Sequence, residues 1–564
     1  MDAQAHRNAR VLGRREVESL IASGRSIIIV DGKVLKVDGW LPYHPGGPKA
    51  IQHMVGRDAT DEMHRFHSAQ TVTLAARYQI GTINGPWLNF TPPIQGGNFR
   101  THEQLAGLSE EEYTPYSDSE HETIGTAPSA QPSPLFEATE AATPTRKRNT
   151  GHIVRASSPS SMSSFELDAR ERPRMSVMDA RTQQEIDLNK AKYPSLDAET
   201  QASIVLKYRE LETRIQAEGL YDCRYSSYGI EALRYASLLA MFVFLLKSGW
   251  YITSAVPLGC LWHQLAFTVH DACHMGITHH YTTDSVIAMS VASYCGGLSA
   301  CWWKHNHNVH HIVTNSPEHD PDIEHLPFLA VTHRLFGNLF STYYEKVLDY
   351  DALARLMLPY QDKLYYVYMA FGRFNLYRLS LTYLLFGHGP RKGPAWWHRY
   401  YELLGQVVFY TWFGYGVVYR SIPGGWNRLL FILLSHAITA PLHVQITLSH
   451  FAMSTADLGV TESFPQKMLR TTMDVDCPQW LDFFHGGLQF QAIHHLYPRI
   501  PRHNLRRTRR LVQEFCNQVN IPYALYGFVE GNKIVLNQLE DVARQAAIFT
   551  QCQRALAESR SNVV

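Results

Sequence analysis

The sequence has few cysteines, and none of them form a CxxC pair. Eight are scattered through 564 residues, which excludes a disulfide framework or a zinc ribbon and fits a protein that faces a reducing compartment. An excess of either charge is also absent, with 52 basic and 51 acidic residues, so we expect no nucleic-acid partner. The N-terminus has no apolar run typical of a signal peptide, so we expect internal segments to provide any membrane attachment.

Residues 11–86 have the mixed pattern of a small α+β domain. A strand–turn–strand segment is followed by an HPGG motif at His44, a GRDAT segment and His67. These motifs resemble the cytochrome b5 domain over nearly the whole range. The resemblance implies a haem b with axial ligands His44 and His67, an iron that passes single electrons rather than binding O2. His53 and His64 are nearby competitors, which we interpret as surface histidines.

Residues 87–195 are rich in Ser, Thr, Pro, Glu and Gly. Such a composition does not bury enough apolar surface to offset its ordering entropy, so it predicts a largely disordered, low-complexity linker. A linker of this kind would let the haem domain move while keeping it at a high effective concentration.

Residues 200–564 contain the apolar segments of an expected all-α membrane domain. A helix needs about 20 residues to cross a bilayer. Four candidates occur as two pairs with short polar turns, which are 228–246 with 250–269 and 404–419 with 429–451. The segment 284–303 is apolar but rich in Gly, Ser and Cys, and we expect it to be re-entrant or interfacial. Because basic residues concentrate outside the two turns, the remaining chain is predicted to face the cytosol.

Three histidine boxes adjoin these segments. Box one contains His270 and His274; box two contains His307, His310 and His311; box three contains Gln491, His494 and His495. Spacings of three and four residues place the imidazoles of a box on one helical face. Neutral imidazole binds iron and zinc alike. Seven histidines exceed what one tetrahedral zinc uses, which indicates two metal ions.

The boxes HDACH, HNHNVHH and QAIHH behind an HPGG domain resemble those of the cytochrome b5-fusion front-end desaturases. In that group a glutamine, here Gln491, typically opens the third box in place of a histidine. The stretches WWKHNHNVHHIVTNSPEHDPDIEH and FFHGGLQFQAIHHLYPRIPRHNL resemble in particular fungal sphingolipid Δ8-desaturases. The resemblance implies that the boxes form the catalytic site around two iron ions, with one further ligand outside them. His450 is our candidate for that ligand, and His436, His443 and His485 are weaker ones.

The implied function is an oxygen-dependent oxidoreductase of the endoplasmic reticulum membrane. It would introduce a double bond between carbons 8 and 9 of the long-chain base of a ceramide or related sphingolipid. Electrons would pass from NADH through a separate cytochrome b5 reductase to the haem and then to the irons, with O2 as co-substrate. An apolar tunnel is expected to measure the chain position.

Three other functions remain open on the sequence. A front-end acyl-lipid (fatty acid) desaturase and a lipid hydroxylase fit the same boxes. A third alternative, a non-catalytic membrane b5 electron carrier, would use the histidines to bind zinc or haem.

Overall fold

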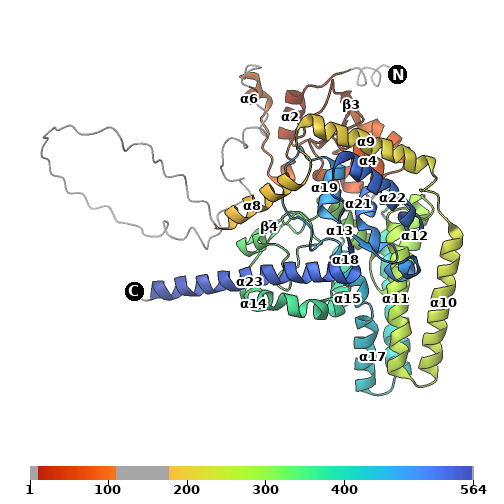
Figure 1. The fold of residues 1–564 in the computed structure, drawn as a ribbon. Coiled ribbons are helices and arrows are strands. Elements are labelled where there is room, and N and C mark those ends of the chain that lie inside the picture. The colour runs from red at the N-terminus through yellow and green to blue at the C-terminus, as the bar shows by residue number, and fades with distance from the viewer. Residues whose placement is uncertain (1–9, 109–112, 114–176, 562–564) are drawn as a thin grey trace.

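The protein is described here by a computed structural model that covers residues 10–108, 113 and 177–561 (Figure 1). Its N-terminal domain is built on a three-stranded antiparallel sheet of β1 (Ile27–Val30), β2 (Lys33–Lys36) and β3 (Gln79–Thr82), in the order β1-β2-β3. Asp31 and Gly32 join β1 to β2 with φ of 50° and 70°, the conformation that a two-residue hairpin turn requires. Short helices surround the sheet, namely α2 (Arg14–Ala22), α3 (Pro48–Gln52), α4 (Thr60–Phe66) and α5 (Ala69–Ala75).

The linker that we expected over residues 87–195 is shorter in the structure, because both of its ends belong to folded parts of the chain. Trp87 donates from Nε1 to the carbonyl of Gly56 at 2.9 Å, and Phe90 is buried in the core of the N-terminal domain. At the other end, α8 (Val177–Lys192) is a helix. The average composition of the segment did not reveal these contacts, because a few aromatic side chains are enough to hold an otherwise polar segment in place. Residues 114–176 lie outside the described part of the chain.

The membrane domain is a group of long helices that extends away from the N-terminal domain (Figure 1). In it α11 (Tyr251–Cys273) packs between α10 (Tyr225–Lys247) and α17 (Gly425–Ala437), which α18 (Ala440–Leu448) continues. Among the described residues, two helices are long and apolar enough to cross a bilayer, Tyr225–Lys247 and Gly425–Leu448. The other two predicted spans also form helices, in α11 and in α16 (His398–Phe409) with η7 (Tyr410–Ser421), but α11 is polar in its second half, where it approaches box one.

The segment that we expected to be re-entrant or interfacial is sharply bent. The helix Tyr281–Cys295, which consists of α12 (Tyr281–Met289) and η4 (Ser290–Cys295), meets α13 (Ala300–Ile312) at 118°, and this pair would make a third span if it crosses as one. Buried Glu402 of α16 accepts hydrogen bonds at the start of α13, from Ser299 Oγ at 2.7 Å and from the Ala300 amide at 2.7 Å. Arg373 donates to the carbonyl of Gly296 at 2.6 Å. These partners satisfy backbone groups at the bend, which a break at membrane depth requires.

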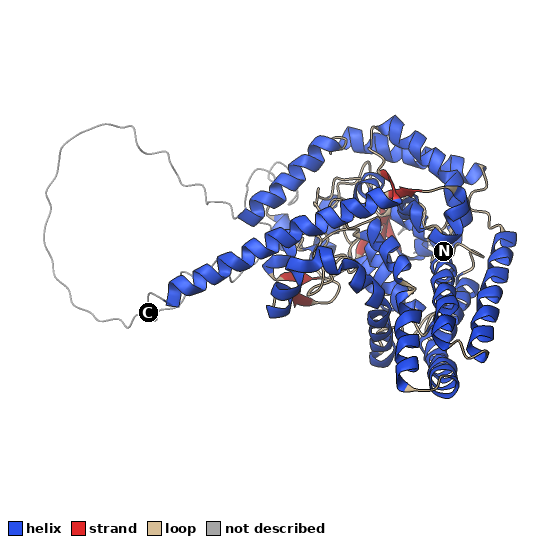
Figure 2. Cartoon of the chain, turned by 60° about the horizontal axis from the view of Figure 1, so that its bottom comes forward, coloured by secondary structure: helices blue, strands red, loops and turns tan. Residues whose placement is uncertain are grey.

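A cap of helices closes the end of the bundle that carries the boxes. Arg502 of α22 pairs with Glu231 of α10 and with Asp271 of α11, and thereby ties the cap to two membrane helices. Figure 2 shows α23 crossing this region and projecting beyond it. The remaining α-helices of the described residues are α6 (His102–Ala106), α9 (Ala198–Ala217), α14 (Ala352–Met357), α15 (Gln361–Phe386), α19 (Phe464–Thr471), α20 (Asp482–His485), α21 (Gln491–Leu496), α22 (Arg502–Val519) and α23 (Phe528–Ser561). Two small sheets pair β4 (Leu339–Ser341) with β5 (Lys346–Leu348) and β6 (Asp474–Asp476) with β7 (Leu525–Gly527).

The contact between α11 and α17 depends on a glycine. A Cβ atom at Gly259 would lie 2.6 Å from Ile438 Cβ and 2.6 Å from the Ser435 carbonyl, whereas one at Gly229 of α10 would meet nothing within 4 Å. We expect Gly259→Ala to lower the midpoint of thermal unfolding in detergent, because overpacking a tight interface costs about 1–3 kcal/mol. The control Gly229→Ala should leave the midpoint unchanged or raise it. Equal midpoints for the two variants would contradict this account of the interface.

Candidate functional site

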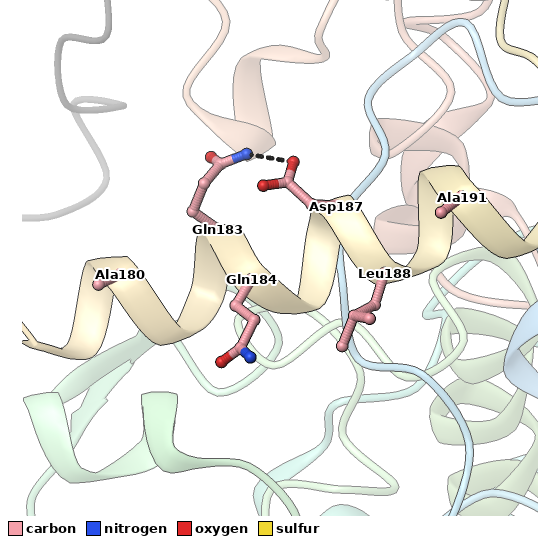
Figure 3. Close-up of a pocket in the computed structure, with 6 residues that line it drawn as sticks. All are labelled: Ala180, Gln183, Gln184, Asp187, Leu188 and Ala191. Carbon is pink, nitrogen blue, oxygen red and sulfur yellow. Dashed lines mark hydrogen bonds between the residues drawn. The ribbon is translucent and has the colours of Figure 1, made fainter.

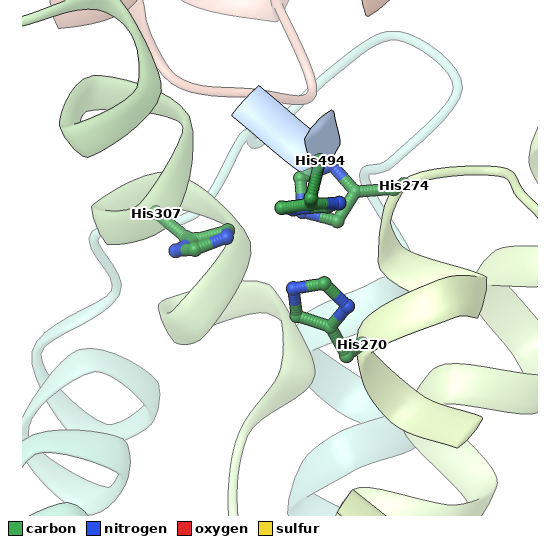
Figure 4. A group of neighbouring side chains, drawn as sticks. All are labelled: His270, His274, His307 and His494. Atoms are coloured by element: carbon green, nitrogen blue, oxygen red, sulfur yellow. The ribbon is translucent and has the colours of Figure 1, made fainter. Parts of the chain in front are cut away.

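Four histidines from three distant segments form a first group (Figure 4). His270 and His274 come from the end of α11, His307 from α13 and His494 from α21, and each offers a ring nitrogen within 4.8 Å of the others. Helical spacing explains the local part, since residues four apart share one face. The convergence of α11, α13 and α21 is a result of the tertiary fold.

A second group lies beside the first. It consists of His310 from α13, His450 just beyond α18 and His495 from α21, again with one ring nitrogen each within 4.8 Å of the others. His311 lies between the groups. Its Nε2 is 3.0 Å from His307 Nε2, and its ring centroid is 4.1 Å from that of His495. His450, the candidate from outside the boxes, therefore lies in the second group.

Most of these imidazoles have a buried ring nitrogen that finds no hydrogen-bond partner among the described residues. These atoms are Nε2 of His270, His274, His494 and His495, and Nδ1 of His311 and His450. Buried polar atoms are normally hydrogen-bonded because their desolvation is otherwise uncompensated. Burial, reinforced by neighbouring histidines, lowers the pKa of His494 and His495 well below the usual range. The neutral imidazole that results is the form that binds metal, so the two groups fit two metal ions.

Several candidates from the sequence lie outside both groups. Gln491 is buried at the start of α21, three residues before His494. His436 is engaged on both sides, with Nδ1 2.7 Å from the carbonyl of Ile432 and Nε2 3.2 Å from the hydroxyl of Tyr377. His443 donates from Nδ1 to the carbonyl of Met369 at 2.8 Å. His485 also lies outside the groups.

The sequence analysis missed the residues that orient these imidazoles. Buried Asp320 accepts from His310 Nδ1 at 2.8 Å and from the Asn315 amide at 2.7 Å, which leaves His310 Nε2 free to face the second group. Thr314 Oγ1 lies 3.3 Å from His495 Nδ1. The indole of Trp303 stacks on His307, with ring centroids 4.1 Å apart. The acidic residues of the HDPD segment were a usable signal, because metal-binding histidines usually donate their other nitrogen to a carboxylate.

His44 and His67 face one another in the N-terminal domain, with ring centroids 5.9 Å apart. Each donates from Nδ1 to a backbone carbonyl, His44 to Gly47 at 2.8 Å and His67 to Met63 at 3.2 Å, so both Nε2 atoms remain free. Burial, followed by the influence of His44, lowers the pKa of His67 to about 3, so this ring is neutral. Apolar side chains of one core cluster lie nearby, including Leu35, Leu41, Met54, Met63 and Tyr78. This arrangement fits a haem with two imidazole ligands.

The two competing histidines of this domain have other partners. His64 lies at the surface and contacts Asp31 at 3.0 Å. His53 is buried, contrary to our expectation, because the helical domain covers this side of α3. Its Nδ1 is 2.9 Å from Gln95 Nε2, and its ring lies 5.3 Å from that of His319.

Two hollows lie away from the histidine groups. One is an open concavity on a single face of α8, where Gln183 donates to Asp187 at 2.9 Å (Figure 3), and it contains no group that points to chemistry. The other, of about 510 Å³, lies between the N-terminal domain and the helical cap, and its lining includes His67, Arg209 and Arg499.

Known proteins resemble the chain in both of its parts. The family model described as cytochrome b5-like heme/steroid binding domain matches residues 14–84, and the fatty acid desaturase model matches residues 248–527. Relatives named delta 8-(E)-sphingolipid desaturase are 57% identical in Emericella nidulans over 98% of both chains, and 46% identical in Kluyveromyces lactis over 98% of this chain and 96% of the relative. A Candida albicans protein of the same name is 45% identical over 96% and 97%. The chain therefore belongs to the fatty acid desaturase family, with a cytochrome b5-like domain ahead of its membrane domain.

Proposed function

We propose that this desaturase introduces a double bond between carbons 8 and 9 of the long-chain base of a ceramide or related sphingolipid. The observation that carries the proposal is the pair of adjacent histidine groups with unpartnered buried nitrogens. The substrate class, the position of the bond and its E geometry follow the names of relatives that are similar over nearly the whole chain.

Removing hydrogen from an unactivated methylene needs an oxidant that no side chain provides, and two iron ions with O2 as co-substrate would supply it. His270, His274, His307 and His494 would hold one ion, and His310, His450 and His495 the other, with His311 between them. Seven of these eight side chains are buried, which would keep bulk water away from the reacting methylenes. An apolar tunnel would then set which carbons reach the site.

Electrons for the reaction would enter through the N-terminal domain. Its two opposed histidines would hold a haem b and leave no open coordination position, so the haem would transfer electrons without binding O2. NADH and a separate cytochrome b5 reductase are the proposed source.

We propose four membrane spans, α10, α11, α16 with η7, and α17 with α18, in the endoplasmic reticulum membrane. The turns at Gly249 and Gly424 would face the lumen, and the boxes and the haem domain would face the cytosol. The length of α11 and its packing between two apolar helices support this arrangement.

A glycosylation acceptor sequence inserted at Gly249 should be modified, whereas one inserted at Gly393 should not. The reverse pattern would overturn the orientation.

Replacing a box histidine should abolish the reaction. We expect a yeast host without sphingolipid desaturation to form a C8 double bond in its long-chain bases with the wild type and none with His311→Ala, as measured by mass spectrometry. Iron per haem should fall in the same variant, because His311 lies between the two metal groups. His280→Ala, which changes an exposed histidine bonded to Thr283, is the matched control and should keep both.

Other products would change the assignment. Altered fatty acids with unchanged long-chain bases would identify an acyl-lipid desaturase, the name of a Borago officinalis relative that is 36% identical over 61% of this chain. A hydroxylated lipid would keep the site but change the reaction. Iron no higher than the haem content would favour the electron carrier.

Asp320 should act by positioning rather than by touching the substrate. We expect Asp320→Asn to weaken iron binding about 10- to 100-fold, the usual effect of losing a carboxylate partner of a ligating histidine. The measurement is the iron retained after dialysis against graded chelator. Asp197→Asn, at the start of α9, is a suitable control because asparagine also caps a helix. Equal retention in the two variants would remove the positioning role.

A further inference from the structure

The haem-ligand segments of the N-terminal domain pack directly against box two. A Cβ atom at Gly46 would lie 2.4 Å from Asn308 Nδ2, and one at Gly47 would lie 3.2 Å from His305 Nδ1. Ile312, which follows His311 at the end of α13, packs against a core cluster of the N-terminal domain. The paired glycines of the HPGG motif therefore also allow close approach between the two domains.

The second haem-ligand segment reaches both box two and box three. The carbonyl of His67 accepts from Arg499 Nη1 at 2.7 Å, and Arg499 follows His495 by four residues. The ring of Phe66 meets the ring of His311 edge-on, with centroids 5.7 Å apart. Since Phe66 is the chain neighbour of His67, the path from a candidate haem ligand to a candidate metal ligand crosses one ring contact.

We propose that the N-terminal domain is held by this chain in a docked, electron-delivering position, in which Phe66 is the positioning residue that links His67 to His311. The inference rests on the proposed function for the identity of the donor and the acceptor. Docking removes the need for the domain to travel to the metal site at each turnover, because the bridging contacts are already made.

Helix α9 contacts both domains and holds them together, and we call it the strap. Arg65 of α4, 4% exposed, pairs with Glu212 of α9 at 2.8 Å and donates from Nε to the Tyr208 hydroxyl at 3.0 Å. The Tyr208 hydroxyl in turn donates to the carbonyl of Leu496, directly after His495. A buried ion pair is strongly destabilising to break, because the partner left behind keeps an uncompensated charge. The strap therefore favours the docked position.

A second ion pair joins the strap to the N-terminal domain, and reversing its charges singly and together tests the docked position. Arg209 of α9, whose side chain is 47% exposed, contacts the largely buried Asp61 of α4 at 2.9 Å. Neither residue belongs to a histidine group, and both line the hollow that His67 also lines. By contrast, the pair between Lys49 and Glu345 lies at the rim with Glu345 exposed, and such pairs contribute little.

The electron balance of the reaction sets how many electrons the docked domain has to transfer. Forming one C=C bond removes two hydrogens from the lipid and reduces O2 to two waters, which consumes two further electrons and two protons. A haem held by His44 and His67 would supply one electron at a time, so each double bond would need two transfers from the docked domain. NADH, through a separate reductase, would supply both electrons.

The experiment follows reoxidation of the reduced haem by stopped-flow absorbance in full-length enzyme with O2 and lipid substrate. We expect Phe66→Leu to slow reoxidation by about tenfold or more, which corresponds to about 1.4 kcal/mol in the barrier. Haem spectrum, iron content and reduction by the reductase should be unchanged. Phe99→Leu, which removes a ring from the other core of the N-terminal domain, is the matched control and should behave as the wild type.

Charge reversal tests the docking itself. Asp61→Arg and Arg209→Glu should each slow reoxidation and raise hydrogen exchange in α4 and α9, since each brings like charges together. The double variant should recover both properties, which general damage to the fold would not do. Wild-type reoxidation in Phe66→Leu, or no recovery in the double variant, would overturn the inference.

The outcomes separate this inference from the proposed function. A C8 double bond made by the wild type together with fast reoxidation in Phe66→Leu would overturn the path and leave the function standing. No new lipid product, together with recovery of exchange protection in the double charge variant, would overturn the function and support the docking.

Discussion

The structure depends on eight imidazoles gathered in one small region, seven of them buried and His270 partly buried. They are His270, His274, His307, His310, His311, His450, His494 and His495. Six of them have a buried ring nitrogen without a partner in the described part of the chain, and metal ions would offset the cost of burying these atoms. The surrounding structure holds these rings in place, through Asp320 beneath His310, Thr314 beside His495 and Trp303 against His307.

The membrane helices and the cap position these rings together. Box one ends α11, whose register against α17 depends on Gly259. Box two lies on α13, which is turned back by a bend that Glu402 and Arg373 stabilise. Box three lies on α21, next to α22, which Arg502 ties to α10 and α11. A shift of any one of these elements would move one set of nitrogens relative to the other two.

The N-terminal domain packs against the desaturase domain instead of moving freely on a tether. A long polar segment between two domains suggests a mobile carrier, but the described ends of this segment pack against folded parts, and α9 binds both domains. The contact surface contains buried charges with partners on both sides. This organisation keeps the haem cradle beside boxes two and three rather than at the end of a free tether.

The sequence alone determined the local chemistry. The HPGG motif and the i, i+3 and i, i+4 spacings identified the histidines, because such patterns act within one turn or one helix. The resemblance also supplied the family, and the apolar stretches predicted the helices around the boxes. His450 was selected from its place at the end of an apolar segment, and it lies in the second group.

The tertiary structure alone decided the rest. The roles of Asp320 and Thr314, the burial of His53 and the strap formed by α9 all depend on contacts between residues far apart in the chain or on the course of a loop. A one-dimensional pattern does not specify such contacts. The ends of the expected linker were missed for the same reason, since Trp87 donates to the carbonyl of Gly56 and Thr182 of α8 lies 3.0 Å from His333 Nε2.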